Sequence, residues 1–360
     1  MNQGRPAYLE KQLQKIPAGE LEVIHRSVFG QDHPHVTDRV LAKTEGKGRM
    51  EVYSVYPGID VSYTAFLSAE ATFHHAASPA IVELFYCHSG RVGWNMRKGT
   101  AVYLGAGDLT VHSAACCADS AMMFPLGYAE GIAISIRLAS LSDNESAILR
   151  EVGREREKIQ SVFCCGKPVI LSSCPDLERI FDPLYAASPA RRSLYLPLKI
   201  QELLLFLLDF QPEQNALTQY CSQQTEQIKR VHQQLTEHLD QRFTIEALSK
   251  QYLMNTATLK KVFKAVYGLP IATYMKEYRI RQAMKLLRET DAPIAEIASQ
   301  VGYGTQGKFS EAFKDVAQML PTAYRKARVS SDRASEARPQ GLVDGATGAG
   351  IRKAGSSGRT

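Results

Sequence analysis

The sequence predicts an α+β protein of several domains: an N-terminal β-rich domain, a helical linker and an all-α C-terminal domain. Three observations support this prediction. Short β-branched and aromatic runs alternate with glycine turns from about Glu22 to Arg137, helical spacing begins near Asn144, and one helical pattern occurs twice near the C-terminus. A chain of 360 residues is also too long for one typical hydrophobic core, which indicates at least two domains.

The β-rich segment is expected at residues 1–140. Val82–Met96 has two β-branched and aromatic runs around a Ser-Gly turn, and Ala101–Ser113 has a strand, a Gly-Ala-Gly-Asp turn and another strand. Gly131–Leu138 is a further strand. Short strands joined by glycine turns are typical of a sandwich or a barrel.

Residues 141–225 are expected to form a helical linker and a candidate dimerisation region. In Ser193–Phe210 the spacing predicts one apolar stripe with Pro197 near the helix start, and the leucines on that stripe are Leu198, Leu204, Leu205 and Leu208. The stripe can pack on its own domain or on the same helix of a second subunit. Tyr220–Gln227 is polar and rich in glutamine, so we expect a hinge there.

Composition places the chain among cytoplasmic globular proteins. Apolar residues make up 44% and charged residues 22%. The longest dense apolar run, Leu203–Leu208, is far shorter than the roughly 20 residues that a membrane span needs. The first residues contain no apolar signal-peptide region, and seven cysteines with two adjacent pairs do not resemble a disulfide framework.

Positive charge is concentrated in the C-terminal third. Residues 226–328 contain 17 Lys and Arg against 10 Asp and Glu. This balance favours a polyanionic partner for that segment. Residues 329–360 are rich in Gly, Ser, Ala and Arg and are expected to be a disordered tail.

The repeated pattern compares Phe243–Lys264 with Pro293–Lys314. The apolar positions correspond at an offset of 49 residues at the start and 50 at the end, so one residue is inserted in the turn. The matching pairs are Ile245 and Ile294, Leu248 and Ile297, Ser249 and Ala298, Leu259 and Phe309, and Phe263 and Phe313. Apolar pairs at i,i+3 and i,i+4 place one buried face on each helix. The pattern therefore predicts that each unit is a helix-turn-helix whose second helix can enter a major groove.

The connector between the two units is expected to be one rigid helix. Ile271–Thr290 keeps helical spacing, and 20 helical residues span about 30 Å. Successive major grooves on one face of B-DNA lie roughly 34 Å apart. Such a helix can therefore hold two reading units in adjacent grooves.

Five segments in this region resemble the AraC/XylS family of bacterial transcription factors. They are FKAVYG (263–268), YRIRQAMKLL (278–287), IAEIASQVGY (294–303), FSEAFK (309–314) and PTAYR (321–325). The resemblance covers about Gln227 to Arg328 and implies a DNA-binding domain at 226–328 that reads an asymmetric duplex site with both units. Gln318 and Leu320 depart from the family pattern, so we expect the last helix to end differently. The resemblance also implies a homodimer, RNA polymerase as a candidate partner, and a cytoplasmic protein associated with the bacterial nucleoid.

Candidate DNA contacts lie on the outward face of the second helix of each unit. In the first unit they are Asn255, Thr256, Thr258, Lys260, Lys261 and Lys264, and in the second Thr305, Gln306, Lys308, Ser310, Glu311 and Lys314. Asn255 is either a helix cap or a phosphate contact, and for each lysine a solvated helix face is the alternative. The resemblance assigns Lys260 and Lys261 to positions that reach base edges, where lysine can donate to guanine. Glu311 can accept from cytosine or repel phosphate, and Gly307 weakens its helix by about 1 kcal/mol. We therefore expect the first unit to supply more affinity.

The front domain resembles the cupin-like sensing domain that many of these regulators carry. A similar strand and turn pattern occurs in the siderophore-responsive branch, which makes an iron–siderophore, or another small molecule, a candidate effector. Tyr86, His88, Trp94 and Met96 are the candidate residues of an effector pocket, and ordinary core packing is the alternative for each of them.

No catalytic residue, cofactor or metal ligand is assigned. The histidine and glutamate pattern of enzymatic cupins is not present, and Cys116 and Cys117 would point to opposite faces of a strand, so we expect them to be small buried hydrophobes rather than metal ligands with His112. The leading interpretation is a sequence-specific, effector-responsive transcriptional regulator, not an enzyme. The alternatives are a β-barrel enzyme with a DNA-binding appendage and a constitutive architectural protein whose front domain only dimerises.

Overall fold

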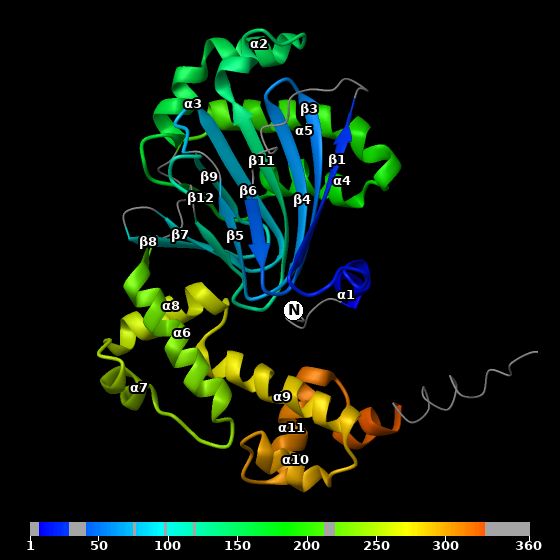
Figure 1. Ribbon diagram of the computed structural model, residues 1–360. Coiled ribbons are helices and arrows are strands. Elements are labelled where there is room, and N and C mark those ends of the chain that lie inside the picture. The colour runs from blue at the N-terminus through cyan, green and yellow to red at the C-terminus, as the bar shows by residue number, and fades with distance from the viewer. Residues whose placement is uncertain are drawn as a thin grey trace, which may run out of the picture. The chain divides into compact units, whose positions relative to one another are not determined.

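The computed structural model describes residues 7–28, 41–74, 77–96, 99–117, 120–211 and 220–327 (Figure 1). The expected tail at 329–360 lies outside the described residues. The chain divides into two compact units, Met1–Tyr278 and Arg279–Thr360. The first unit therefore includes the β-rich segment and the first helix-turn-helix, and the second unit holds the other.

Two sheets form the β-rich part of the first unit, as the sequence predicts. The first sheet contains, in order, β1 (Glu20–Ser27), β3 (Lys47–Tyr56), β4 (Ile59–Leu67), β11 (Ala129–Arg137), β6 (Ile81–Gly90), β9 (Leu109–Ser113) and β12 (Val169–Leu171). The second contains β13 (Tyr220–Cys221), β8 (Thr100–Leu104), β7 (Val92–Met96), β10 (Ala121–Met123), β5 (Glu70–His74) and β2 (Leu41–Thr44). Neighbouring strands are antiparallel except for β1 and β3, which are parallel.

Helices complete the β-rich part of the first unit. They are α1 (Ala7–Gln12), the 3-10 helix η2 (Leu138–Leu141), α2 (Ala147–Arg154), α3 (Arg156–Phe163), α4 (Pro175–Ala186) and α5 (Pro189–Asp209). One core cluster joins Val61 and Ile134 of the first sheet to helix residues such as Phe181 and Leu204. Because β12 lies within the segment expected as a linker and the helices of that segment share this core, residues 141–211 are part of the sandwich domain.

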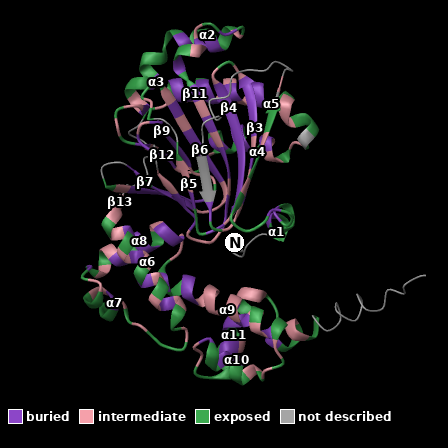
Figure 2. Cartoon of the chain, viewed as in Figure 1, coloured by how far each residue is buried: buried purple, intermediate pink, exposed green. Residues whose placement is uncertain are grey.

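The central strands of the first sheet are buried on both faces. A second core cluster joins Phe66 and Phe85 of this sheet to Trp94 and Leu104 of the second sheet. Strand β4 is consequently buried along almost its whole length, and buried residues dominate the strands in Figure 2. A strand covered on both faces does not need the polar and apolar alternation of a half-exposed one.

Helix α5 differs from its prediction in two respects. It begins at Pro189, so Pro197 lies inside the helix and Pro189 takes the first-turn position that suits proline. The leucines of the predicted stripe lie on two different faces of the helix. Leu204 is fully buried, whereas 64% of Leu198 is exposed. Leu205 lies on the exposed side with Leu198, and Leu208 on the buried side with Leu204.

The expected hinge at Tyr220–Gln227 is wrong. Tyr220 and Cys221 form β13, which pairs with Ala101 and Thr100 of β8. Helix α6 (Ser222–Glu237) begins at the next residue. The polar, glutamine-rich composition that suggested a hinge instead provides the exposed face of a regular helix.

Two helix-turn-helix units have the predicted repeat. In the first, α7 (Ile245–Gln251) and α8 (Thr256–Tyr267) have 7 and 12 residues, and in the second α10 (Ile294–Gln300) and α11 (Gln306–Ala317) have the same lengths. The turn is one residue longer in the second unit, as the offset predicts. Helix α9 (Ile271–Glu289) is continuous, and the boundary between the compact units falls within it.

Each helix-turn-helix contains one residue other than glycine in the left-handed conformation. At the matching position, the other helix-turn-helix has a glycine. In the turn Leu253 has φ 51° where its counterpart Gly302 has φ 81°. At the end of the second helix Gln318 has φ 57° where its counterpart Gly268 has φ 85°. The expectation that Gln318 changes the end of its helix is wrong, because the amides of Gly268 and Gln318 donate to the carbonyls of Lys264 and Lys314 at the same distance, 2.8 Å.

A left-handed residue with a Cβ is strained by roughly 1–2 kcal/mol. We therefore expect Leu253→Gly to raise the free energy of unfolding by about 0.5–1 kcal/mol, after the entropy that glycine adds to the unfolded chain. Gln318→Gly should likewise raise the free energy of unfolding, through the second helix-turn-helix. Urea denaturation measures both changes.

Leu253→Ala is the matched control because it removes the side chain, which is 91% exposed, but keeps the Cβ. An equal gain from Leu253→Ala and Leu253→Gly would show that backbone strain is not the cause.

Candidate nucleic-acid interface

Helix α8 presents a positively charged outer face in the first unit. Lys260, Lys261 and Lys264 are exposed, and α8 contains no acidic residue. On the opposite face Leu259 and Phe263 are fully buried, which fixes the rotation of the helix about its axis. The three lysines are therefore held toward solvent by packing on the other side.

The cap of α8 uses one of the predicted DNA contacts. The side-chain oxygen of Asn255 accepts a hydrogen bond from the backbone N–H of Thr258 at 2.7 Å. Asn255 is exposed, while Thr256 and Thr258 are half-buried. The amide group of Asn255 keeps its NH₂ donors for another partner.

Helix α11 has a similar frame but a mixed charge. The hydroxyl of Thr305 caps it by accepting from the backbone N–H of Lys308 at 3.3 Å. The other predicted contacts are exposed except Ser310, which is half-buried, and these exposed residues are Gln306, Lys308, Glu311 and Lys314. The buried face contains Phe309 and Phe313. With Glu311 and Asp315 among its exposed residues, α11 is the less basic of the two second helices.

An aromatic cluster supports α8 from behind. His232 of α6 stacks on Tyr267 with ring centroids 4.2 Å apart, and its Nε2 lies 2.8 Å from the hydroxyl of Tyr274. Burial lowers the pKa of His232 to about 4, so the ring is neutral near pH 7. His232 is half-buried because Tyr267 of α8 and Tyr274 of α9 both cover this position, which the helical spacing of α6 alone does not show.

Arg91 connects the sandwich domain to the end of α8, and the sequence interpretation missed it. Its Nε donates to the carbonyl of Val266 at 3.0 Å, and a terminal nitrogen donates to the carbonyl of Ala265. These carbonyls lie in the last turn of α8, where the helix dipole favours a cation. Burial lowers the pKa of Arg91, and nearby Asp108 opposes that shift.

Gly268 allows this close approach. It ends α8 in the left-handed conformation, and a Cβ at this position would lie 3.2 Å from the Cδ and Nη1 of Arg91. Apolar packing continues the contact, because Ala101 and Tyr103 of the second sheet share a core cluster with Ile228 of α6. The first helix-turn-helix is therefore packed on the sandwich domain with its lysines still exposed.

The four predicted effector residues lie in two different cores. Tyr86 stacks on Phe181 at 4.0 Å, and His88 stacks on Tyr185 at 3.6 Å, both against α4. Burial raises the pKa of Tyr86 to about 12 and lowers that of His88. Trp94 and Met96 belong to the core between the two sheets. The structure does not bring the four together, because β7 is in the second sheet and β6 in the first.

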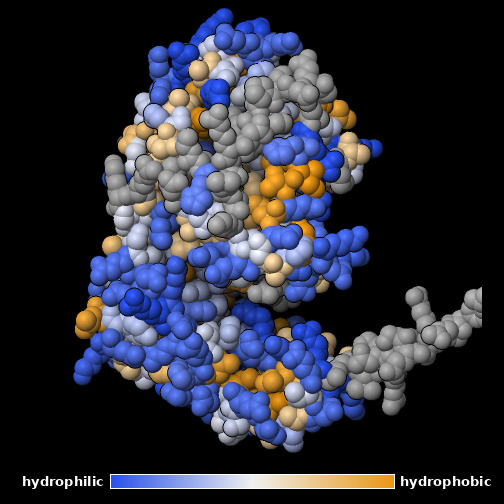
Figure 3. Space-filling view, viewed as in Figure 1, coloured by the Kyte–Doolittle hydropathy of each residue, from blue (hydrophilic) through white to orange (hydrophobic). Residues whose placement is uncertain are grey.

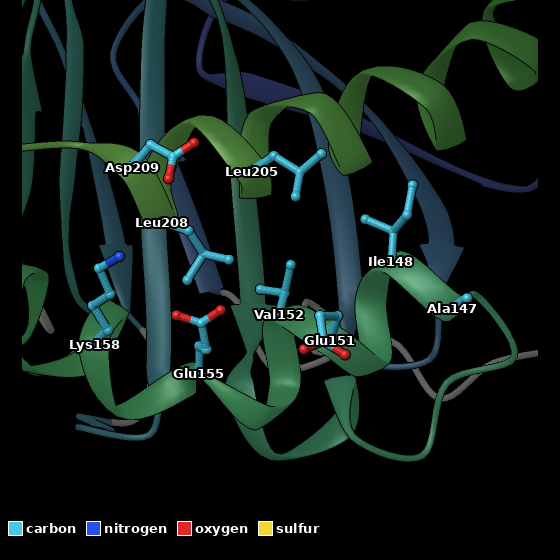
Figure 4. A pocket seen from close by; sticks show the side chains of 9 residues that line it. All are labelled: Ala147, Ile148, Glu151, Val152, Glu155, Lys158, Leu205, Leu208 and Asp209. Carbon is cyan, nitrogen blue, oxygen red and sulfur yellow. The ribbon is translucent and has the colours of Figure 1, made fainter.

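A surface pocket of about 400 Å³ lies between α2, α3 and α5 (Figure 4). Apolar side chains converge on it, and charged groups surround them; its lining is Ala147, Ile148, Glu151, Val152, Glu155, Lys158, Leu205, Leu208 and Asp209. None of the nine is a predicted effector residue. In Figure 3 the visible surface is mostly hydrophilic, with apolar side chains gathered in separate patches.

Within the described residues, every helix is too short or too polar to cross a lipid bilayer.

Two helix-turn-helix units, one with a basic second helix, define a protein of the nucleic-acid-binding class. A family model described as a helix-turn-helix domain matches residues 248–327. The regulatory protein SoxS of Escherichia coli strain K12 is 31% identical over 91 residues, which are 25% of this chain and 85% of SoxS. The chain belongs to the AraC/XylS family of helix-turn-helix transcriptional regulators. Members of this family are transcription regulators and not enzymes.

Likeness to whole proteins is lower. The transcriptional regulator ExsA of Pseudomonas aeruginosa is 25% identical over 183 residues, 51% of this chain and 64% of ExsA. The chain thus spans less than two thirds of this relative. The solved DNA-binding domain of AdpA, in complex with a target DNA, is 27% identical with a TM-score of 0.27, over 32% of this chain and 97% of that one.

Arg91→Ala should loosen the last turn of α8 and lower the free energy of unfolding by about 1–3 kcal/mol, because two carbonyls lose a charged donor. Urea unfolding followed by Trp94, the one tryptophan of the chain, measures the loss. Amide hydrogen exchange should become faster at the C-terminal end of α8. Arg91→Lys keeps the charge but not the paired donors, so its loss should be intermediate.

Arg154→Ala is the matched control, because Arg154 is an exposed arginine whose side chain is 72% accessible. If Arg91→Ala is as stable as Arg154→Ala and exchange in α8 is unchanged, the contact does not stabilise the helix.

Proposed function

We propose that this chain is a sequence-specific DNA-binding transcriptional regulator that contacts double-stranded DNA with α8 and α11. The observation that carries the proposal is the outer face of α8: three exposed lysines, no acidic residue, and a buried opposite face. A helix fixed in this way can enter a major groove with its lysines near base edges and phosphates.

The two helix-turn-helix units have different electrostatic character. Glu311 and Asp315 on α11 reduce the attraction of the second unit to phosphate, whereas α8 has no such residue. We therefore propose that α8 supplies most of the affinity and that α11 adds selectivity. The 19 residues of α9 give a length of about 28 Å, which is similar to the roughly 34 Å between successive grooves.

The front domain is proposed to respond to a small molecule and to act on α8 through Arg91. The hydroxyl of Tyr185 is buried without a hydrogen-bond partner in the described part of the chain. This group supports an effector-binding site beneath α4. His88 stacks on the same ring. A polar effector in contact with Tyr185 would satisfy this group. An iron–siderophore remains one candidate class, and RNA polymerase a candidate partner of the bound regulator.

A regulator that reads the chromosome acts in the bacterial cytoplasm, at the nucleoid, and we propose that location. The alternative of a constitutive architectural protein differs in one measurable respect. Its DNA affinity would not change with any small molecule that raises its melting temperature.

Self-association is proposed through the exposed side of α5. Leu194 and Leu198 are 69% and 64% exposed and Leu205 44% exposed, and their spacing places them on one side of the helix. Ile148, at the adjoining pocket, is 38% exposed and extends this apolar surface. The same surface on a second copy could cover it in a symmetric dimer.

DNA binding is tested with Lys261→Ala. Selection of genomic fragments with the purified full chain first identifies bound sites, and fluorescence anisotropy then measures affinity at two salt concentrations. If Lys261 reads a base, its loss should weaken specific binding by about 1–3 kcal/mol. An equal loss on unrelated duplexes would assign Lys261 to phosphate instead.

Lys158→Ala on α3 is the control, because it removes the same charge from an exposed site outside the helix-turn-helix. Equal effects of the two variants, or the selection of no preferred sequence, would contradict the proposal.

The α5 surface is tested with Leu198→Glu. A charge in the centre of an apolar interface should shift the chain from dimer to monomer in sedimentation experiments at micromolar concentration. Leu320→Glu, at a leucine that is 49% exposed in the second unit, should leave the dimer intact. A monomeric wild-type chain would refute the assignment.

A further inference from the structure

Three side chains with metal-binding groups meet at the edge of the core between the two sheets. Glu83 on β6 and His112 on β9 are direct partners in the antiparallel register. Both point toward the second sheet, because their neighbours Val82, Leu84 and Val111 belong to the core on the helix side. Cys117 follows β9 in a turn and completes the group.

The ligand atoms of these three residues all lie within 4.8 Å of one another. The Sγ of Cys117 is 3.8 Å from the Nδ1 of His112 and 2.9 Å from a carboxylate oxygen of Glu83. Tetrahedral zinc with ordinary bond lengths places such atoms about 3.4–3.6 Å apart. One separation therefore already agrees to about 0.2 Å, and the other must widen by about 0.7 Å.

The surroundings also suit a metal ion. His112 is 4% and Cys117 5% exposed, and Glu83 is half-buried. A thiolate and a carboxylate with a neutral imidazole carry two negative charges, which a divalent cation balances in a place where an unbalanced charge is costly. Nitrogen, sulfur and oxygen ligands together are the set that zinc accepts.

Cys116 and Cys117 are buried, as expected, but the strand geometry that the sequence analysis assumed for them is not present. The sequence analysis placed both cysteines on a strand, with side chains on opposite faces, but both lie in a turn after β9 ends at Ser113. Cys116 lies 3.5 Å from the hydroxyl of Ser113 and is not in the group. Glu83 was not a candidate, and only the strand register brings it opposite His112.

We propose that Glu83, His112 and Cys117 bind one divalent transition-metal ion of the zinc class, with a fourth position open to water or to a further donor. Binding removes the thiol proton, which in the metal-free form Cys117 donates to Glu83. It also turns the Nδ1 lone pair of His112 to the ion, so the contact of Nδ1 with the Ser113 carbonyl at 3.2 Å is given up.

The site is separate from the proposed DNA contacts. Glu83 lies near the start of β6 and Arg91 directly after its end, and eight residues of strand span about 27 Å. Metal binding can therefore be measured on the full chain without DNA. Failure to bind DNA would leave the metal result unaffected, and failure to bind metal would leave the regulator proposal standing.

Cobalt(II) is the probe, because a thiolate ligand gives it a near-ultraviolet charge-transfer band and a tetrahedral site gives it visible absorption. The chelator-treated full chain should bind one equivalent with both features, and zinc should displace it. Cys117→Ser should abolish the charge-transfer band, whereas Cys116→Ser, one residue away, should keep it. His112→Ala and Glu83→Gln should weaken binding roughly tenfold or more.

Melting curves of the metal-free variants show whether each is folded. If Cys117→Ser does not fold, the wild type still decides the question, since zinc should protect Cys117 from alkylation under native conditions and leave the exposed Cys165 reactive. An absent cobalt band in the wild type, a band that persists in folded Cys117→Ser, or zinc-dependent protection of Cys165 without protection of Cys117 would overturn the proposal. In each of those cases the three residues form a buried hydrogen-bonded group only.

Discussion

The burial of the central strands of the first sheet on both faces is the constraint on which the sandwich domain depends. Helices cover one face and the second sheet covers the other, so consecutive residues of these strands enter different cores. Strand β6 illustrates this most clearly. Tyr86 packs against α4, whereas its neighbours Phe85 and Cys87 pack toward the second sheet.

The burial of these strands on both faces determines which side chains of the front domain meet at the proposed metal site. Because side chains alternate, Glu83 faces the core between the sheets and meets its register partner His112 there. The same strand leads directly to Arg91, whose guanidinium reaches the last turn of α8. One strand thus contacts the helix-side core, supplies the proposed metal ligand and ends beside the first helix-turn-helix.

Much of the architecture could be predicted from the sequence because it follows from local periodicity. The repeat at an offset of 49 to 50 residues specified two units of equal helix lengths, and Leu259, Phe263, Phe309 and Phe313 are fully buried as their spacing indicates. The lysines of α8 are exposed for the same reason. These features require only the 3.6-residue period of one helix.

Features that depend on contacts between distant segments could not be predicted in this way. Tyr220–Cys221 begins a segment that is polar as a whole but pairs with β8, and His232 lies on the polar part of α6 but is covered by Tyr267 and Tyr274. In the sequence, Arg91 is an ordinary arginine between two strands. Only the folded structure brings the end of α8 against it. In each instance the partner is more than 30 residues away, and no local pattern records the pairing.

The contact of Arg91 also gives the proposed effector response a short route from the sandwich domain to α8. Its two hydrogen bonds end on Ala265 and Val266, which directly follow the exposed Lys264 and lie about one turn beyond Lys261. Because α8 is a rigid element with its inner face packed in the core that Tyr103 of the second sheet shares, a shift of that sheet must either move α8 or break these bonds. The core of the second helix-turn-helix, around Phe309, is made of residues after Arg279, whereas α8 belongs to the same compact unit as the sandwich domain. The more basic helix is therefore one that the front domain contacts directly.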